Sequence, residues 1–279
     1  MVKITGKTID NFKEHLINEE KSKATTEKYV HDVSAFAAWL GTAALCKIKI
    51  LEYKEYIIGK YAPASVNSML SSLNSFFEYA GEFALKVKNL KIQKQIFATK
   101  EKELTKDEYS RLLTAAKSKG NRKLYLLMQT MCATGIRVSE LRFIGVEALG
   151  NGRAEVNLKG KLRVIIIPRE LCNMLKKYAA EQKITSGSIF VTKTGKPLDR
   201  TNIWKMMKAL CKSANVDKGK VFPHNLRHLF ARTFYSAEKD IVRLADILGH
   251  SSVNTTRIYT METWDICRRQ VQGLGLLRC

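Results

Sequence analysis

Apolar residues recur at helical spacing along most of this chain, and one segment departs from that pattern towards that of β-strands. The spacing is already clear in residues 8–40, where two apolar stripes follow each other. The departure lies in residues 153–168, where two β-branched runs flank the tip Lys159-Gly160-Lys161. Such runs around a short polar tip predict a β-hairpin. We therefore expect a mainly α-helical fold with one small β-sheet.

A Lys-, Gln- and Glu-rich stretch interrupts the helical pattern near the end of the first third of the chain. A chain of 279 residues is long enough for two hydrophobic cores. We therefore expect an N-terminal helical bundle in residues 1–90, a basic linker in residues 91–103 and an α+β domain in residues 104–279. Thr105 followed by Glu108 is the pattern of a capping box that starts the first helix of the second domain.

The apolar spacing predicts helices on both sides of the linker. In the first domain they fall in two segments of residues 8–40 and in residues 50–61 and 64–81. In the second domain they fall in residues 105–119, 124–134, 169–182, 201–214, 225–236, 241–248 and 253–259.

Positive charge is concentrated in the second domain. The chain has 48 Lys and Arg against 26 Asp and Glu, a formal net charge of +22. Residues 1–95 hold 14 Lys, no Arg and 10 acidic residues, so 34 basic and 16 acidic residues follow them. Because an excess of this size favours polyanionic partners, we expect nucleic acid binding, carried mainly by the second domain.

Membrane and redox classes are disfavoured by the sequence. No window approaches the roughly 18 consecutive apolar residues of a membrane span, and residues 1–10 are too polar for a secretory signal. The six cysteines lie far apart and form no C-x-x-C pair. We therefore expect a cytoplasmic protein with reduced thiols and no membrane partner.

Three of the five histidines cluster near the C-terminus together with Arg227 and Tyr259. His224 and His228 have the i, i+4 spacing of zinc ligands, but the glutamate of an H-E-x-x-H motif is absent. An arginine between two ligands would repel a metal ion. The cluster therefore indicates metal-free chemistry, and we expect no metal or other cofactor.

Four sequence boxes carry a specific resemblance. They are residues 133–141 (ATGIRVSEL), residues 224–228 (HNLRH), Leu248-Gly249-His250 and Tyr259. In order and spacing they resemble the tyrosine recombinase (phage integrase) family, and the first 90 residues resemble its helical, SAM-like core-binding domain. The resemblance implies two domains that form a C-shaped clamp around a DNA duplex.

The resemblance implies a catalytic set, which consists of Arg137, Lys161, His224, Arg227, His250 and Tyr259. Two guanidiniums suit the negative charge that grows on the non-bridging oxygens of a phosphodiester under attack. A tyrosine hydroxyl, with a pKa near ~10, needs nearby positive charge and a proton acceptor to attack at neutral pH. A lysine on a hairpin tip can protonate the departing hydroxyl.

These arguments assign a role to each residue. We expect Arg137 and Arg227 to bind the phosphate, His250 to donate a hydrogen bond to it, and His224 to assist the nucleophile Tyr259. Lys161 is the expected general acid.

Several assignments stay open. The hairpin is one residue shorter than the family pattern G-K-G-x-K-x-R, so Lys159 competes with Lys161. Glu140 either orients a basic residue of the site or forms an exposed i, i+3 ion pair. We expect His228 to have a supporting role and Trp264 to be buried in the core.

The resemblance also implies the reaction and its partners. The tyrosine would form a 3′-phosphotyrosyl bond with double-stranded DNA at inverted-repeat core sites, and four copies would act on two sites. The C-terminal segment, residues 262–277, would pack either on a neighbouring copy or on its own domain. The short hairpin favours integration or excision of a mobile element or phage, with a possible directionality factor. The alternatives are Xer-type resolution of chromosome or plasmid dimers, a type IB topoisomerase and a non-enzymatic DNA-binding protein.

Overall fold

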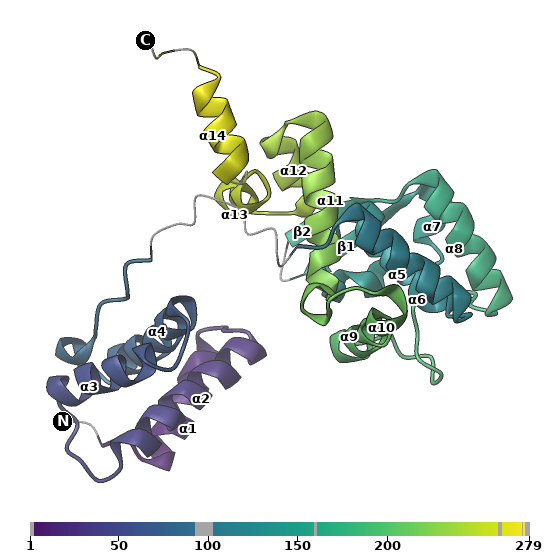
Figure 1. Cartoon of the computed structure of the whole chain (residues 1–279). Coiled ribbons are helices and arrows are strands. Elements are labelled where there is room, and N and C mark those ends of the chain that lie inside the picture. Colours follow the sequence, from purple (N-terminus) through teal and green to yellow (C-terminus); the bar gives the residue numbers. More distant parts are fainter. Residues whose placement is uncertain (1–2, 93–102, 159–160, 262–263, 275, 277–279) are drawn as a thin grey trace. The chain divides into compact units, whose positions relative to one another are not determined.

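The fold is given by a computed structural model, which describes residues 3–92, 103–158, 161–261, 264–274 and 276. The chain divides into two compact units, Met1–Lys94 and Gln95–Cys279. Each unit has its own hydrophobic core. Figure 1 shows helices in both units and one short hairpin in the second. The expected mainly helical fold with a small sheet is confirmed.

In its described residues, the N-terminal unit is a bundle of four helices and one short 3-10 turn. They are α1 (Gly6–Asn18), α2 (Lys23–Leu40), α3 (Lys47–Ile58), α4 (Pro63–Tyr79) and η1 (Phe83–Leu85). The chain marks their starts locally: Thr5 and Ser22 cap α1 and α2, and Pro63 opens α4 at a position that needs no N–H. Helix α2 packs on both α1 and α4 around buried Phe12 and Phe36.

The second unit alternates longer helices with short turns. Before and around the hairpin lie α5 (Lys106–Ser118), α6 (Arg122–Thr134), η3 (Val138–Phe143), α7 (Ala148–Asn151), β1 (Arg153–Leu158), β2 (Lys161–Ile166) and α8 (Arg169–Glu181). After it lie α9 (Arg200–Lys208), α10 (Cys211–Ala214), η4 (Lys218–Lys220), α11 (Pro223–Glu238), α12 (Ile241–Leu248), α13 (Val253–Thr256), η5 (Arg257–Tyr259) and α14 (Trp264–Gln272).

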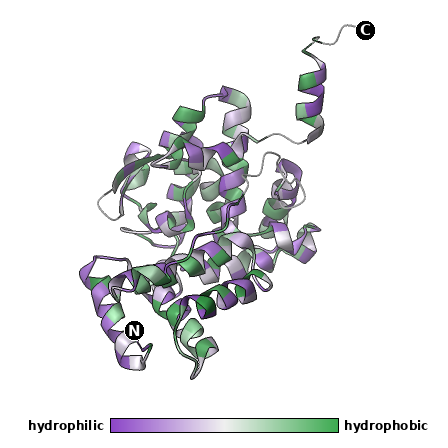
Figure 2. Cartoon of the chain, turned by 90° about the vertical axis from the view of Figure 1, so that its left-hand side faces the viewer, coloured by the Kyte–Doolittle hydropathy of each residue, from purple (hydrophilic) through white to green (hydrophobic). Residues whose placement is uncertain are grey.

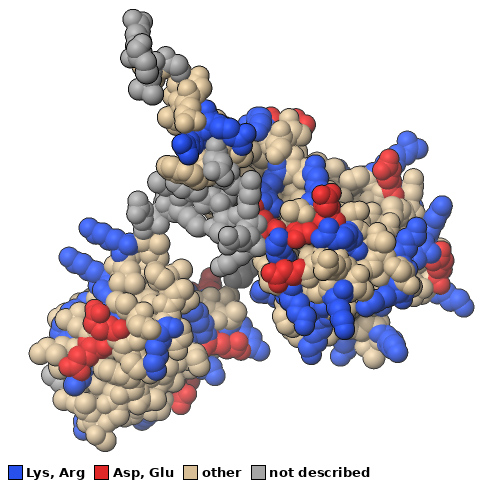
Figure 3. All heavy atoms as spheres, viewed as in Figure 1, with Lys and Arg blue, Asp and Glu red and all other residues tan. Residues whose placement is uncertain are grey.

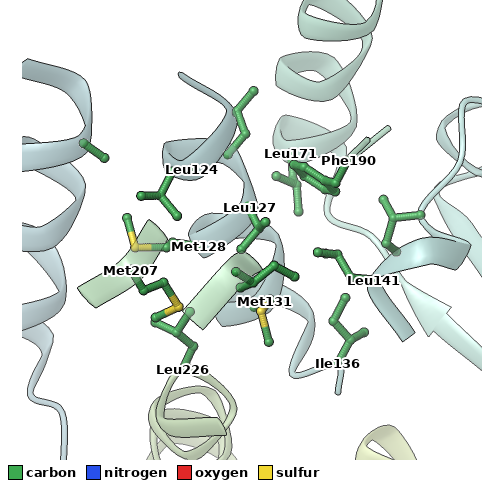
Figure 4. Packing of buried hydrophobic residues seen from close by; sticks show 14 of the residues in the cluster. Leu124, Leu127, Met128, Met131, Ile136, Leu141, Leu171, Phe190, Met207 and Leu226 are labelled. Atoms are coloured by element: carbon green, nitrogen blue, oxygen red, sulfur yellow. The ribbon is translucent and has the colours of Figure 1, made fainter. Parts of the chain in front are cut away.

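Helix α6 is the centre of the second core. Its buried face packs against side chains from the loops after it and from α8, α9 and α11. Figure 4 shows Leu127, Met128 and Met131 of α6 facing Met207 and Leu226. Since α6 and α11 pack extensively, this core holds together the two helices that carry the first two sequence boxes.

Two expected helices differ in detail from the structure. Residues 201–214 form two helices, because Leu210 N–H donates to the Met207 carbonyl in a tighter i to i−3 turn between them. Residues 253–259 form one turn of α-helix followed by the 3-10 turn η5. The predicted capping box of Thr105 and Glu108 is present at the start of α5.

The hairpin has one packed face and one open face. Strands β1 and β2 are antiparallel, with Leu158 opposite Lys161. Ala154, Val156 and Ile165 are buried, whereas Leu162, Val164 and Ile166 are exposed. The hairpin is therefore held to the domain through alternate residues only.

Among the described residues, no helix is both long and apolar enough to cross a membrane. Figure 2 shows hydrophobic and hydrophilic residues mixed along the helices.

Candidate active site

The first sequence box is positioned by a left-handed glycine at the end of α6. Gly135 has φ of +62°, and a Cβ there would lie 2.3 Å from the ring of Phe230. This close approach seats the end of α6 directly on α11. Arg137 follows two residues later, as the residue that caps η3.

Arg137 is held by a carboxylate and by a backbone carbonyl. Its Nη1 donates to Glu140 Oε1 at 2.9 Å, and its Nη2 donates to the Gly249 carbonyl at 3.2 Å. The Arg137 side chain is 40% exposed, whereas that of Glu140 is 3% exposed. The buried Glu140 carboxylate therefore orients the more exposed Arg137 side chain. The alternative of an exposed ion pair is wrong.

Arg227 is buried at the centre of the site, with 1% of its surface exposed. Its Nη1 donates to the Gly135 carbonyl at 2.6 Å, and its Nη2 donates to the Leu248 carbonyl at 2.8 Å and to His250 Nε2 at 2.9 Å. Burial, together with the positive charge of Arg137, lowers the pKa of Arg227 to about 10. The described hydrogen bonds of this charged group all go to neutral acceptors, so its charge is available to an anion.

The turn after α12 fixes His250. Gly249 ends α12 in the left-handed region, and His250 N–H donates back to the Ala245 carbonyl, the arrangement of a Schellman motif. Because Arg227 can only donate, His250 Nε2 accepts, and Nδ1–H donates to Thr256 Oγ1 at 2.8 Å. Burial, together with neighbouring arginines, lowers the pKa of His250 to about 4.

Tyr259 lies on η5 with 4% of its surface exposed. Its ring is 5.0 Å from the ring of His228, edge to face, and 6.2 Å from the ring of His250, nearly parallel. It also packs in the small apolar cluster that contains Leu244 and Leu248. The structure therefore places Tyr259 beside His228 and His250 of the same chain.

His224 lies one helical turn before His228 and lines a cavity. The two imidazoles are 4.6 Å apart between ring centroids, in an edge-to-face arrangement. The cavity, of about 430 Å³, is also lined by Arg137 and Arg200. Burial lowers the pKa of His224, and the positive charges of Arg227, Arg137 and Arg200 act in the same direction. A neutral imidazole is therefore available to accept a proton.

The two candidate lysines of the hairpin are only partly described. Lys161 is the first residue of β2, and its side chain lies outside the described part of the structure. Lys159 lies outside the described residues altogether. The structure thus brings together five of the six expected residues as side chains, and the sixth as a strand position.

Three residues of this site do not follow from the sequence boxes. Arg163 bonds Glu140, Thr256 holds His250, and Arg200 lines the cavity beside His224. Thr256 could have been noticed from its position three residues before Tyr259. Arg163 and Arg200 meet the site only through tertiary contacts, and Figure 3 shows many other Lys and Arg side chains on the visible face of this unit.

The C-terminal helix corrects one expectation. Trp264, at the start of α14, is 59% exposed, so its expected burial in the core is wrong. Val271 and Leu274 on the same segment are also exposed.

Among the described residues, no group of three His, Cys, Asp or Glu side chains could hold a metal ion.

The buried histidines predict that acid destabilises the protein. Burial lowers the pKa of both His228 and His250 to about 4, whereas an unfolded histidine titrates near ~6.5. Between these values the unfolded chain binds more protons, so the free energy of unfolding falls as pH falls. We expect a loss of at least about 1 kcal/mol between pH 7 and pH 5, measured by urea unfolding.

The matched comparison uses single Gln substitutions. His228→Gln is expected to flatten this pH dependence, whereas His31→Gln, an exposed site on α2, is expected to leave it unchanged. An identical slope in the His228→Gln protein would contradict the prediction.

Comparisons with known proteins identify the family. The Phage integrase family profile matches residues 102–264, and the N-terminal SAM-like domain profile of phage integrases matches residues 9–82. Tyrosine recombinase XerA of Pyrococcus furiosus is 31% identical, over 98% of this chain and 96% of its own length.

Two solved structures share the fold. The XerH site-specific recombinase bound to its difH substrate has a TM-score of 0.72 at 19% identity, covering 96% of this chain and 84% of that one. A lambda integrase tetramer bound to a Holliday junction has a TM-score of 0.71 at 20% identity, covering 93% of this chain and 78% of that one.

Proposed function

Because this chain belongs to the phage integrase family of tyrosine recombinases, enzymes that cleave and rejoin DNA, we propose that Tyr259 is its nucleophile. One observation carries the proposal. Tyr259 stacks on His250, which accepts a hydrogen bond from a buried arginine, Arg227, whose described partners are all neutral. A buried cation next to a tyrosine suits a reaction in which an anionic phosphate enters the site.

The remaining residues receive roles in the same reaction. The Tyr259 oxygen attacks phosphorus, and His224 accepts its proton. Arg137 and Arg227 stabilise the non-bridging oxygens, because charge-assisted hydrogen bonds are strongest where negative charge grows. The bond from phosphorus to the 5′ oxygen breaks, and Lys161 gives that oxygen a proton. The products are a 3′-phosphotyrosyl ester and a free 5′-hydroxyl, and attack by another 5′-hydroxyl reverses the steps.

His250 must change partners for its proposed role. In the structure its Nε2 accepts from Arg227, so it cannot donate to a phosphate in this state. When Arg227 turns to the phosphate, Nε2 is free to take a proton and donate a hydrogen bond. The hydrogen bond between His250 and Arg227 is thus the arrangement of the proposed site before a phosphate binds.

We further propose that the biological reaction is site-specific recombination of the Xer type. The preference for integration rested on the short hairpin, and nothing beyond the hairpin supports it. Full-length similarity to the XerA recombinase, over 98% of this chain, favours resolution of DNA dimers. Double-stranded DNA with inverted-repeat core sites is the proposed substrate.

We also propose that four copies act on two such sites. The lambda integrase neighbour is a tetramer on a Holliday junction; α14 exposes Trp264 and Val271, and Leu274 just after it is exposed as well. Apolar side chains on a terminal helix suit docking on a neighbouring copy better than solvent.

The test is an adduct trap on the DNA of the organism that encodes the chain. Genomic fragments carrying nicks that block rejoining are incubated with the protein, and SDS-resistant complexes are isolated and sequenced. Adducts at one chromosomal or plasmid locus support the Xer-type reaction, whereas adducts at the ends of a mobile element would establish integration instead. Relaxation of any supercoiled plasmid without a preferred sequence would indicate a topoisomerase.

A further inference from the structure

Arg163 is a largely buried arginine that ties the hairpin to the proposed phosphate site. It lies on β2, two residues after Lys161, with its side chain 10% exposed. Its Nη1 donates to Glu140 Oε2 at 2.6 Å, and its Nη2 donates to the carbonyl of Ile247 in the last turn of α12. One side chain thus connects three elements that are far apart in sequence.

The Glu140 carboxylate extends this connection to Arg137. Its Oε2 accepts from Arg163 and from the backbone N–H of Arg137, while its Oε1 accepts from Arg137 Nη1. The positive charges of the two arginines and the hydrogen bonds of Arg137 keep Glu140 ionised, and the pKa of its carboxyl lies below the usual value despite burial. The carboxylate is therefore a fixed bridge between Arg163 and the phosphate-binding Arg137.

Gly249 leaves room for Arg163. A Cβ at Gly249 would lie 2.5 Å from Arg163 Cδ and 2.9 Å from its Nε. Gly249 also has φ of +64°, so it serves both the turn and the close approach. The Arg163 side chain therefore packs against the backbone immediately before His250.

Among the residues of β2 whose side chains are described, Arg163 is the one nearest the hairpin tip that contacts the rest of the domain. The outer residues Leu162 and Val164 are exposed, and the next inward residue away from the tip is Ile165. A two-stranded hairpin is only marginally stable by itself, so the placement of its tip depends on such anchors. Arg163 Nε is buried without a hydrogen-bond partner among the described residues, which argues against a purely stabilising role.

We propose that Arg163 is a positioning residue for the protonation of the leaving group. It fixes the start of β2 against the phosphate-binding turns, so that Lys161 is delivered to the departing 5′ oxygen. This inference rests on the proposed function of the site, and in particular on the general-acid role of the hairpin.

The test uses Arg163→Gln on two forms of the trapped DNA site. In one form the bridging 5′ oxygen at the scissile phosphate is replaced by sulfur. A thiol has a pKa near ~8.5, against about 15.7 for water, so a thiolate leaves without protonation. We expect single-turnover cleavage of ordinary DNA to fall about 100-fold, and cleavage of the sulfur-containing DNA to stay within about threefold of the unsubstituted protein.

Three matched variants complete the experiment. Arg153→Gln, an exposed arginine at the far end of the same hairpin, should change neither rate. Glu140→Gln should slow both substrates, because it releases Arg137. Arg163→Lys keeps the charge but reaches only one of the two acceptors, so it should show a smaller loss with the same sulfur rescue, and it carries the test if the Gln variant does not fold.

An equal loss of Arg163→Gln on both substrates would overturn the proposal, since the residue would then act through Arg137 or the fold. Full activity of both Arg163 variants on ordinary DNA would overturn it as well. The Lys161→Ala variant tests whether Lys161 is the general acid. It therefore distinguishes a failure of the Arg163 proposal from a failure of the general-acid assignment. If sulfur rescues Arg163→Gln but not Lys161→Ala, Arg163 positions the hairpin and another hairpin group supplies the proton.

Discussion

Tyr259→Phe is expected to abolish the covalent DNA adduct, with a loss of more than about 10⁴-fold, while DNA affinity stays within about twofold. The change removes only the hydroxyl. The ring contacts with His228 and His250 and the packing against Leu244 and Leu248 remain. The loss should therefore appear in SDS-resistant complexes and not in band-shift titrations or melting curves.

The control is Tyr235→Phe, which removes a hydroxyl from a tyrosine packed against the same apolar cluster. This variant should form adducts at the normal rate. Residual adduct from Tyr259→Phe would show that another residue is the nucleophile, and loss of DNA binding would show that the hydroxyl supports the fold.

The parts of the site that could be predicted are those set by short-range patterns. The caps of α5 and the helical face of α6 are properties of neighbouring residues, so sequence alone indicates them. The boxes around Arg137, Arg227 and His250 each sit at a helix end or on a helix face whose glycine or periodicity is visible in the sequence. The burial of Tyr259 in its own domain was not predictable, because it depends on contacts with α11 and α12 and not on neighbouring residues.

The parts of the site that could not be predicted depend on contacts between residues far apart in the sequence. Glu140 meets Arg163 across 23 residues, and Arg163 meets Ile247 across 84. No spacing rule connects such residues, because the contact exists only when β2, η3 and α12 are packed together. The hydrogen bond of His250 to Arg227 and Thr256, which sets its tautomer, is likewise invisible before the turn after α12 is built. Trp264 was misassigned because an apolar residue near a chain end can serve a core or an exposed docking face equally well.

Arg227→Ala is expected to lose both catalysis and stability, whereas Arg137→Ala is expected to lose catalysis alone. Each substitution removes a proposed donor to the phosphate, so each should slow cleavage by about 10²- to 10³-fold or more. Arg227→Ala also leaves the Gly135 and Leu248 carbonyls without their partner inside the core, which should lower the free energy of unfolding by about 2–4 kcal/mol.

Arg137→Ala removes a side chain that is 40% exposed. Glu140 keeps its bonds to Arg163 and to the backbone N–H of residue 137, so the free energy of unfolding should change by less than about 1 kcal/mol. DNA affinity should stay within a modest factor for both variants, because many other basic residues share the phosphate contacts. Paired urea unfolding and single-turnover cleavage assays separate the two effects. Equal stability losses would mean that the burial of Arg227 has no energetic consequence, and normal cleavage by either variant would remove that arginine from the proposed phosphate site.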